Sequence, residues 1–210
     1  MAVWNEVLTG IVLVAGGYWI IKTIYQWRLF RRSIYTEIYS AYIEYAFRKK
    51  NLVRLSESYY LKNELGKHRI VYQIVQAKGE KNPQAYILLL VSTGIYIINV
   101  KNQRGTIHLK CHGDKESRRP MDESRFFAKR MRQRIGEPEL PLRAIVVFPE
   151  KSELIWEGPE DQEIMVVKRK GLIEAVKNDM ASGREILSES RIDEIYHFLA
   201  DESIEMERNM

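Results

Sequence analysis

Apolar residues fill two neighbouring stretches near the middle of the chain. Residues 86–91 read YILLLV and residues 95–98 read IYII, with Gly94 in the short stretch between them. Runs of this length, rich in β-branched and aromatic residues, are typical of buried strands, and a tight connection containing glycine indicates that the two strands are adjacent. We therefore expect both to lie in the middle of a β-sheet.

The same pattern predicts further elements on both sides of this pair. Strands are expected at residues 68–76, 106–110, 143–148 and 163–168, and helices at residues 122–135, at residues 171–180 and from Ser188 onward. Between Tyr35 and Phe47, apolar and aromatic residues recur at spacings of three and four, which predicts one helix with Ser33 as its N-cap. We expect the strand at 106–110 to join the central sheet, giving about four strands, with later strands added to it.

The amino-terminal region lacks charge over a long stretch. Residues 7–21 read VLTGIVLVAGGYWII, and the run continues through Lys22 to Trp27 if the lysine amine reaches toward the lipid headgroups. About twenty residues of this kind are enough for a helix to cross a bilayer. Trp4, Tyr25 and Trp27 flank the run, and such rings prefer the membrane interface. We therefore predict one transmembrane helix and membrane contact through residues 7–27.

Positive charge follows the apolar run instead of preceding it. Arg28, Arg31 and Arg32 come directly after it, which predicts an outside amino terminus and a cytoplasmic remainder. A cleavable signal peptide has its basic residues before the apolar run, so we expect this segment to stay attached. The chain then divides into an anchor with a basic flank at residues 1–32, a cytoplasmic domain at 33–200 and a polar tail at 201–210. This predicts a single-pass protein of the cell membrane, and the sequence leaves its oligomeric state open.

Composition narrows the choice of chemistry. A single cysteine, Cys111, excludes an intrachain disulfide and fits a reducing compartment. One cysteine and four histidines in 210 residues do not support a structural zinc site, which normally needs four ligands. The net charge of +5 attracts polyanions such as nucleic acid or anionic lipid without selecting between them.

Positive charge is densest within the predicted helix at residues 122–135. Five basic residues fall within ten positions there: Arg125, Lys129, Arg130, Arg132 and Arg134. Such a surface contacts phosphates through charge and does not read bases. A solvated helix face, or a contact with anionic lipid, is an equally good interpretation of this pattern alone.

A polar pair follows the second central strand. Alternation of side chains along a strand places Asn99 and Lys101 on one face of the sheet. Together with the residues around it, this pair resembles the core motif of the nuclease-related domain (NERD), a branch of the PD-(D/E)xK nuclease superfamily. The matching positions are Gln84, Gly94, the strand at 95–98, Lys101, Asn102 and Gly105. The resemblance implies an α/β, restriction-endonuclease-like fold in which helices flank a mixed sheet, here preceded by the transmembrane helix.

Two positions of the motif depart from the family pattern. Tyr86 stands where the family has aspartate, and Asn99 stands where it has glutamate. In the superfamily these acids hold a divalent cation, usually Mg²⁺, and the lysine helps to position the attacking water. A phenol and a neutral amide lack the charged oxygens that Mg²⁺ prefers. We therefore expect no metal and no other cofactor, and we interpret Lys101 as a vestige of a catalytic site.

The resemblance also implies which residues meet a ligand. On the superfamily plan, the helix that follows the lysine strand flanks the nucleic-acid cleft. A further acid on the first helix of the superfamily corresponds to Glu37 or Glu64 in this chain. The implied binding residues are Gln84, Arg119, Arg125, Lys129 and Arg132.

One hypothesis and two alternatives follow. The hypothesis is a membrane-anchored, catalytically inactive NERD protein that serves as a binding or scaffolding module at the cytoplasmic face, for nucleic acid or for a protein partner. The first alternative is an active Mg²⁺-dependent endonuclease whose acids have moved to Asp114, Glu116, Asp122 or Glu123. The second alternative is a structural partner of another membrane protein, with arginine-rich surfaces in contact with lipid.

Overall fold

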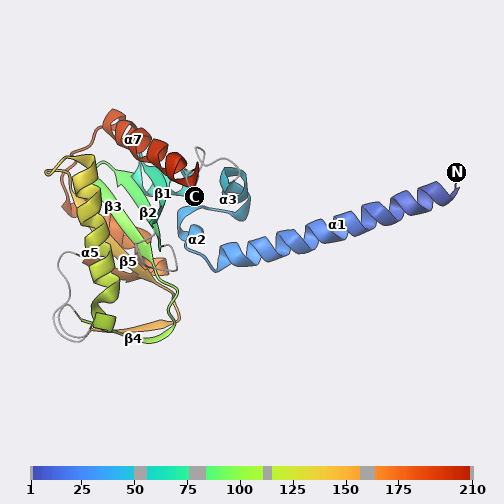
Figure 1. Ribbon diagram of the computed structural model, residues 1–210, viewed down its shortest axis with the longest axis horizontal. Coiled ribbons are helices and arrows are strands. Elements are labelled where there is room, and N and C mark those ends of the chain that lie inside the picture. The colour runs from blue at the N-terminus through green and yellow to red at the C-terminus, as the bar shows by residue number, and fades with distance from the viewer. Residues whose placement is uncertain (1, 50–55, 76–83, 111–114, 157–163, 209–210) are drawn as a thin grey trace.

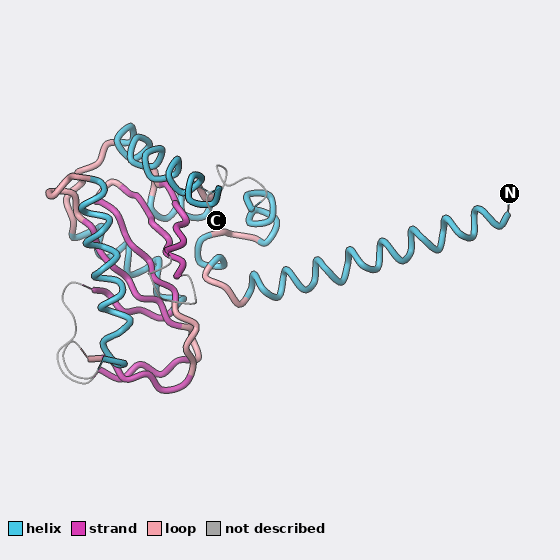
Figure 2. Tube along the Cα trace, in the orientation of Figure 1, coloured by secondary structure: helices cyan, strands magenta, loops and turns pink. Residues whose placement is uncertain are grey.

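The computed structural model describes residues 2–49, 56–75, 84–110, 115–156 and 164–208. A β-sheet with helices around it forms the body of the protein, and one long helix extends away from that body (Figure 1). Figure 2 shows the strands as a layer between helices.

The main sheet has five strands and confirms the predicted mixed α/β architecture. Its order is β1 (Arg69–Val75), β2 (Gln84–Val91), β3 (Gly94–Val100), β5 (Leu142–Phe148) and β7 (Ile164–Lys168). The first three strands form an antiparallel meander, and β5 and β7 are added in parallel. The two apolar runs are adjacent, as predicted, with Val91 paired to Gly94 across their short connection.

Helices bury both faces of this sheet. Helices α5 (Lys115–Ile135) and α7 (Glu189–Arg208) lie on one face, and α2 (Tyr35–Ile38), α4 (Tyr59–Leu65) and α6 (Leu172–Ser182) lie on the other, where a short 3₁₀ turn (Arg169–Gly171) leads into α6. Side chains alternate along β2, so Leu88 packs with α5 and α7, while Leu89 packs with α2, α4 and α6. Because helices cover both faces of each central strand, nearly every side chain of the strand is buried, and its sequence is an uninterrupted apolar run.

The predicted strand at 106–110 forms, but its place in the sheet was predicted wrongly. Strand β4 (Gly105–Leu109) pairs in parallel with β6 (Ser152–Trp156) in a separate two-stranded sheet. The chain leaves the main sheet after Val100, and Gly105 turns it with a φ of +86°. Leu109 then packs against Phe148 and Trp156 in a third apolar cluster. Strand β6 was not predicted, because its five residues mix polar and apolar side chains.

The single helix predicted from Tyr35 to Phe47 is broken in the structure. Helix α2 ends at Ile38, and α3 (Tyr42–Lys49) begins after an extended residue, Tyr39, with φ −119° and ψ 136°. Tyr39 is buried, and its hydroxyl lies 3.2 Å from the hydroxyl of Tyr72 on β1. Burial of this ring against the sheet explains the break. The Ser33 hydroxyl does accept a hydrogen bond from the Tyr35 amide, but the N-cap position belongs to Ile34.

Two helix boundaries also differ from the prediction. Helix α5 begins at Lys115 and contains Pro120, whereas the sequence predicted a start at Asp122. Proline removes one helical hydrogen bond, but the helix continues because the next residue, Met121, is fully buried in the core. Helix α7 begins after Ser188, whose hydroxyl accepts from the Arg191 amide, and it continues through the predicted polar tail to Arg208.

A buried histidine joins α4 to the strand that follows it. The His68 ring accepts a hydrogen bond at Nε2 from the Ser58 amide, 3.0 Å away, and its Nδ1 lies 2.9 Å from the Gly66 carbonyl oxygen. Burial lowers the pKa of His68, so the ring stays neutral near neutral pH and its Nε2 can accept. The side chain therefore has a structural role.

Helix α1 (Ala2–Arg31) extends away from the body of the protein (Figure 1). Its last turn is tied to the domain by Phe30, which is buried and whose ring lies 5.2 Å from the ring of Tyr45. Farther along α1, large apolar side chains such as Leu13 and Val14 are exposed. Within the described part of the chain, no helix is both long and apolar enough to cross a membrane, so the predicted transmembrane span is not supported.

Candidate functional site

Strand register brings the two unusual motif positions together. Tyr86 on β2 and Asn99 on β3 are direct cross-strand partners, and Lys101 follows Asn99 by two residues. Tyr86 and Asn99 are 3% and 2% exposed. Tyr86 and Asn99 both contact α5, and Lys101 does so as well. The sequence therefore predicted the shared face of Asn99 and Lys101 correctly.

Helix α5 closes this face over Tyr86. The Tyr86 ring stacks on the ring of Phe127, with centroids 3.9 Å apart and an interplanar angle of 4°. The Tyr86 hydroxyl lies 3.5 Å from the carbonyl oxygen of Glu123, one turn earlier in the helix. A phenol at this position fills the space between sheet and helix, where a carboxylate would leave a gap.

Asn99 is held by the same helix. Its Nδ2 donates to Oγ of Ser124 at 3.0 Å, and the Ser124 hydroxyl donates to the carbonyl oxygen of Pro120 at 2.9 Å. Ser124 is fully buried. A buried amide needs partners of this kind, and the serine supplies one without introducing a charge.

Lys101 pairs with a carboxylate from α5. Its Nζ lies 2.5 Å from Oε2 of Glu123, and the other carboxylate oxygen, Oε1, lies 2.7 Å from Nε of Arg119. The side chains of Lys101 and Glu123 are 16% and 17% exposed, so this pair is shielded from solvent more than a typical surface ion pair. One carboxylate therefore bridges two cations at the edge of the closed face.

Comparison with known families gives an independent assignment. Residues 49–149 match the model of the nuclease-related domain. The chain carries a nuclease-related domain. No curated protein and no solved structure matches the chain. The match contains the central strands and α5, and ends before β6. The resemblance of the motif around Lys101 is thus confirmed.

The donor atoms of this nuclease-related domain do not fit a Mg²⁺ site. At the two positions where the family has acids, the chain offers a buried phenol and a buried amide that already donates to Ser124. The nearby carboxylate, Glu123, is held by Lys101 and Arg119. Among the described residues, no group of three or more His, Cys, Asp or Glu side chains is placed to hold a metal ion. Magnesium prefers several charged or carbonyl oxygens, which this face does not present.

The other acidic candidates do not complete such a site. The Asp122 carboxylate pairs with Arg125, 3.2 Å away on the same helix. Asp114 and the side chain of Glu116 lie outside the described residues. Glu64 pairs with Lys177 of α6, which packs on the opposite face of the sheet, so its carboxylate does not join Lys101 beneath α5.

Glu37 is likewise engaged away from α5. It belongs to α2, and its carboxylate lies 3.5 Å from Nε of Arg169. Helix α2 packs on the sheet face opposite α5. The suggested correspondence of Glu37 with a catalytic acid is therefore not supported by its position.

The predicted binding residues divide into two groups. Arg119 and Arg125 are engaged with Glu123 and Asp122, whereas Lys129 and Arg132 are exposed on the later turns of α5. Gln84 begins β2 opposite Val75, and its side chain lies outside the described residues. We use the term α5 basic face for Lys129, Arg130 and Arg132, which are all exposed.

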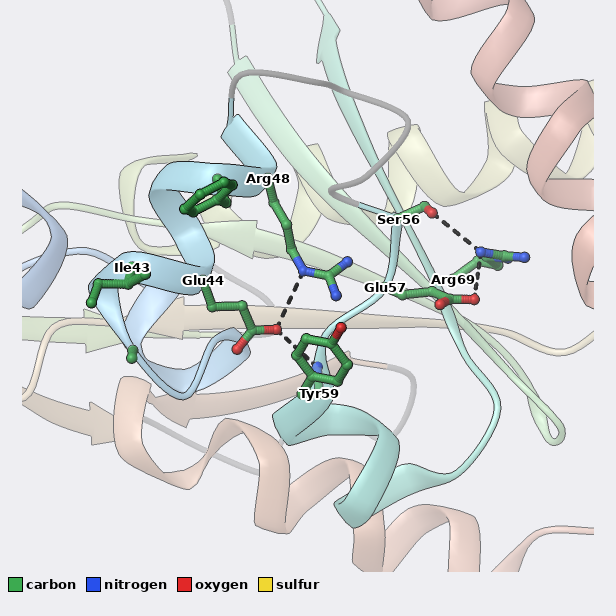
Figure 3. A pocket seen from close by; sticks show the side chains of 9 residues that line it. Ile43, Glu44, Arg48, Ser56, Glu57, Tyr59 and Arg69 are labelled. Atoms are coloured by element: carbon green, nitrogen blue, oxygen red, sulfur yellow. Dashed lines mark hydrogen bonds and ion pairs between the residues drawn. The ribbon is translucent and has the colours of Figure 1, made fainter.

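A cavity of about 730 Å³ lies between α3, α4 and β1 (Figure 3). In it, Arg48 Nε lies 3.3 Å from Oε1 of Glu44, and its guanidinium lies 5.0 Å from the centre of the Tyr59 ring. On the other side, Arg69 pairs with Glu57. No residue of the motif beneath α5 lines this cavity, so it is separate from the face that holds Tyr86, Asn99 and Lys101.

Proposed function

We propose that this protein is a membrane-attached nuclease-related domain that no longer cleaves and serves as a nucleic-acid-binding module at the cytoplasmic face. The observation that carries the proposal is the burial of Tyr86 and Asn99 beneath α5. A phosphodiester, a metal ion and a water would all need access to the positions that these side chains fill.

Opening this face would require α5 to leave the sheet. Met121, Phe127 and Met131 of α5 are buried in the core, at 4% exposure or less. Exposing each such side chain costs about 1.5–3 kcal/mol, so the three together oppose opening by roughly 5 kcal/mol or more. At tenfold per 1.4 kcal/mol, an open form would be populated at about one molecule in several thousand or fewer. This argues against an active site that opens for substrate.

The α5 basic face supports binding to a polyanion. Among the residues that the structure describes, Lys129, Arg130 and Arg132 form no ion pair, in contrast to Arg119 and Arg125 earlier in the helix. When such cations contact phosphates, counterions condensed on the nucleic acid are released into solution. This release makes binding favourable and dependent on salt concentration. The helix belongs to the matched nuclease-related region, whose superfamily acts on nucleic acid.

Exposed apolar side chains around α1 support membrane attachment. Val12, Leu13 and Val14 are consecutive residues, each rotated by about 100° from the one before it around the helix axis, and all three are exposed, Val14 by 74%. A helix that is apolar all round is normally covered by protein or lipid. The basic residues after the apolar run lie at the domain end of α1, which favours a cytoplasmic domain.

We predict no metal-dependent cleavage by the full-length protein. With Mg²⁺ or Mn²⁺, conversion of supercoiled DNA or of a labelled RNA should not exceed that of the Lys101→Ala variant, because the required oxygen ligands are missing. The matched control is Lys129→Ala, which removes a cation outside the closed face.

The first alternative has one observation in its favour, namely the contact between Glu123 and Lys101. If Glu123 has replaced a lost acid, metal-dependent cleavage should be present and should disappear in both Lys101→Ala and Glu123→Gln. That result would reverse the proposal. The second alternative, a structural partner of another membrane protein, would be favoured by an absence of nucleic-acid binding at low salt.

Membrane attachment through α1 is tested by flotation. We expect the full-length protein to float with phosphatidylcholine vesicles in high salt, since insertion of apolar side chains does not depend on charge. Leu13→Asp combined with Ile20→Asp should abolish flotation, because a carboxylate strongly opposes entry of these positions into the apolar part of the bilayer. The control, Ile43→Asp with Phe47→Asp, changes exposed apolar residues of α3 and should float. Release of the unmodified protein by salt would contradict this part of the proposal.

A further inference from the structure

An aromatic ring projects from α5 next to the α5 basic face. Phe126 is 59% exposed, whereas the next residue, Phe127, is buried against Tyr86. One turn of helix separates Phe126 from Arg130, and the Arg130 guanidinium lies 5.8 Å from the centre of the Phe126 ring. Lys129, at the neighbouring spacing of three, lies on the same side of the helix. The ring is thus exposed among cations.

This arrangement is not explained by folding. Phe126 belongs to none of the buried clusters, and an exposed phenylalanine gains little from burial on its own helix. Arg130 contacts the ring by a cation–π interaction, but more than half of the side chain remains open to another partner. Charge alone would be enough to hold phosphates, so the ring points to a ligand that also has flat apolar surfaces.

We propose that this surface binds single-stranded nucleic acid, with Phe126 stacking on a base and Lys129, Arg130 and Arg132 contacting phosphates. The inference rests on the proposed nucleic-acid function and names its substrate class. Aromatic side chains among basic residues are the usual way in which proteins hold unpaired strands, because every base offers a flat face. In a duplex those faces are covered by neighbouring base pairs, so an exposed ring on a helix surface has nothing to stack on.

The position of α5 argues against a lipid surface as the partner. Helix α1, which we propose to attach the protein to a membrane, extends from one side of the domain, and α5 lies on the side away from it (Figures 1 and 2). The helix that carries Phe126 and the α5 basic face therefore lies on the other side of the domain from the helix that would enter the bilayer. A soluble polyanion can reach them.

The test compares three probes that share length and differ in their bases. Fluorescence anisotropy would measure binding of the full-length protein, in uncharged detergent at low salt, to a twenty-nucleotide oligo(dT), an abasic strand and a duplex. We expect oligo(dT) to bind most tightly. Phe126→Ala should weaken oligo(dT) binding about 5- to 150-fold, the range found for one stacked base, and leave the other two probes unchanged.

Two sets of variants separate stacking from charge. Phe126→Trp should retain oligo(dT) binding, and Phe198→Ala, which removes another exposed phenylalanine on α7, should have no effect. Lys129→Gln combined with Arg132→Gln should weaken binding to all three probes and reduce the salt slope for single strands by about 1.4.

The outcomes distinguish this inference from the function on which it rests. If no probe binds at low salt, the proposed nucleic-acid function fails, and this inference fails with it. If oligo(dT) and the abasic strand bind equally and Phe126→Ala changes neither, the function stands and the stacking role is overturned. Tighter binding to the duplex than to oligo(dT) would also overturn it.

Discussion

Tyr86→Asp, which places at this position the acid expected from the family, is expected to destabilise the protein by about 4 kcal/mol or more instead of creating a metal site. The substitution removes the ring that stacks on Phe127 at 3.9 Å and leaves a cavity beneath α5. Aromatic-to-small changes in cores cost about 3–5 kcal/mol, and lost stacking is part of that penalty. The new carboxylate would also be buried at a position that is now 3% exposed.

Urea denaturation followed by circular dichroism measures this effect, with Tyr86→Phe as the matched control. The control keeps the ring and loses the hydroxyl, whose contact with the Glu123 carbonyl oxygen is long at 3.5 Å, so we expect it to lie within about 1 kcal/mol of the unmodified protein. Burial should raise the pKa of the introduced aspartate. The loss of unfolding free energy in Tyr86→Asp, relative to the unmodified protein, should therefore grow as pH rises above about 3.9. Above that pH the carboxyl ionises in the unfolded chain and resists ionisation in the folded one.

A second variant makes this prediction sharper. Tyr86→Asp combined with Asn99→Glu supplies both family acids at once. If millimolar Mg²⁺ restores the stability of this double variant to that of the unmodified protein, the face beneath α5 can still accommodate a metal. The claim that packing has replaced the catalytic site would then be wrong.

Gly94→Ala should destabilise the protein by roughly 3–5 kcal/mol, through backbone strain and a direct clash. Gly94 has a φ of +139°, a conformation that residues with a side chain rarely adopt, and an added Cβ would lie 2.5 Å from the carbonyl oxygen of Pro141. That oxygen cannot easily retreat, because it accepts a hydrogen bond from the Ile95 amide at 3.0 Å. The clash would fall where β3 meets β5, the pairing that positions Asn99 and Lys101.

Gly105→Ala is the matched control for this variant. Gly105 also has a positive φ, +86°, but a Cβ there would meet no atom within 4 Å. Gly105→Ala should therefore lower the free energy of unfolding only through the unfavourable backbone conformation, by about 1–2 kcal/mol. The two variants are compared by their midpoints of urea unfolding. Equal destabilisation by the two variants would show that the clash with Pro141 does not contribute to the effect of Gly94→Ala.

The site could be predicted from the sequence only in part. The uninterrupted apolar runs and the short connection at Gly94 are local properties, and they were sufficient to predict two adjacent central strands. Alternation along β3 then fixed the shared face of Asn99 and Lys101. The replaced acids at Tyr86 and Asn99 could likewise be recognised without coordinates, because the spacing of the motif is preserved.

Other features depended on contacts between distant segments. The sequence offered four relocated acids as alternatives, and only the packing of α5 on the sheet brought Glu123 to Lys101. The break at Tyr39 arises because its ring meets Tyr72, thirty-three residues later. Strand β4 lies outside the main sheet because it pairs with β6, and β6 follows it by more than forty residues. No pattern within β4 itself could indicate that partner.

The sequence by itself determined the central strands, the face that Asn99 and Lys101 share, and the absence of acids at the two motif positions. Side-chain periodicity and residue chemistry are local, so they can be read along the chain. The tertiary structure alone decided that α5 closes this face, that Glu123 neutralises Lys101, and that Phe126 points to solvent. Those features depend on how α5 packs against strands that lie far from it in the sequence. The pattern of residues within a single helix or strand does not determine that packing.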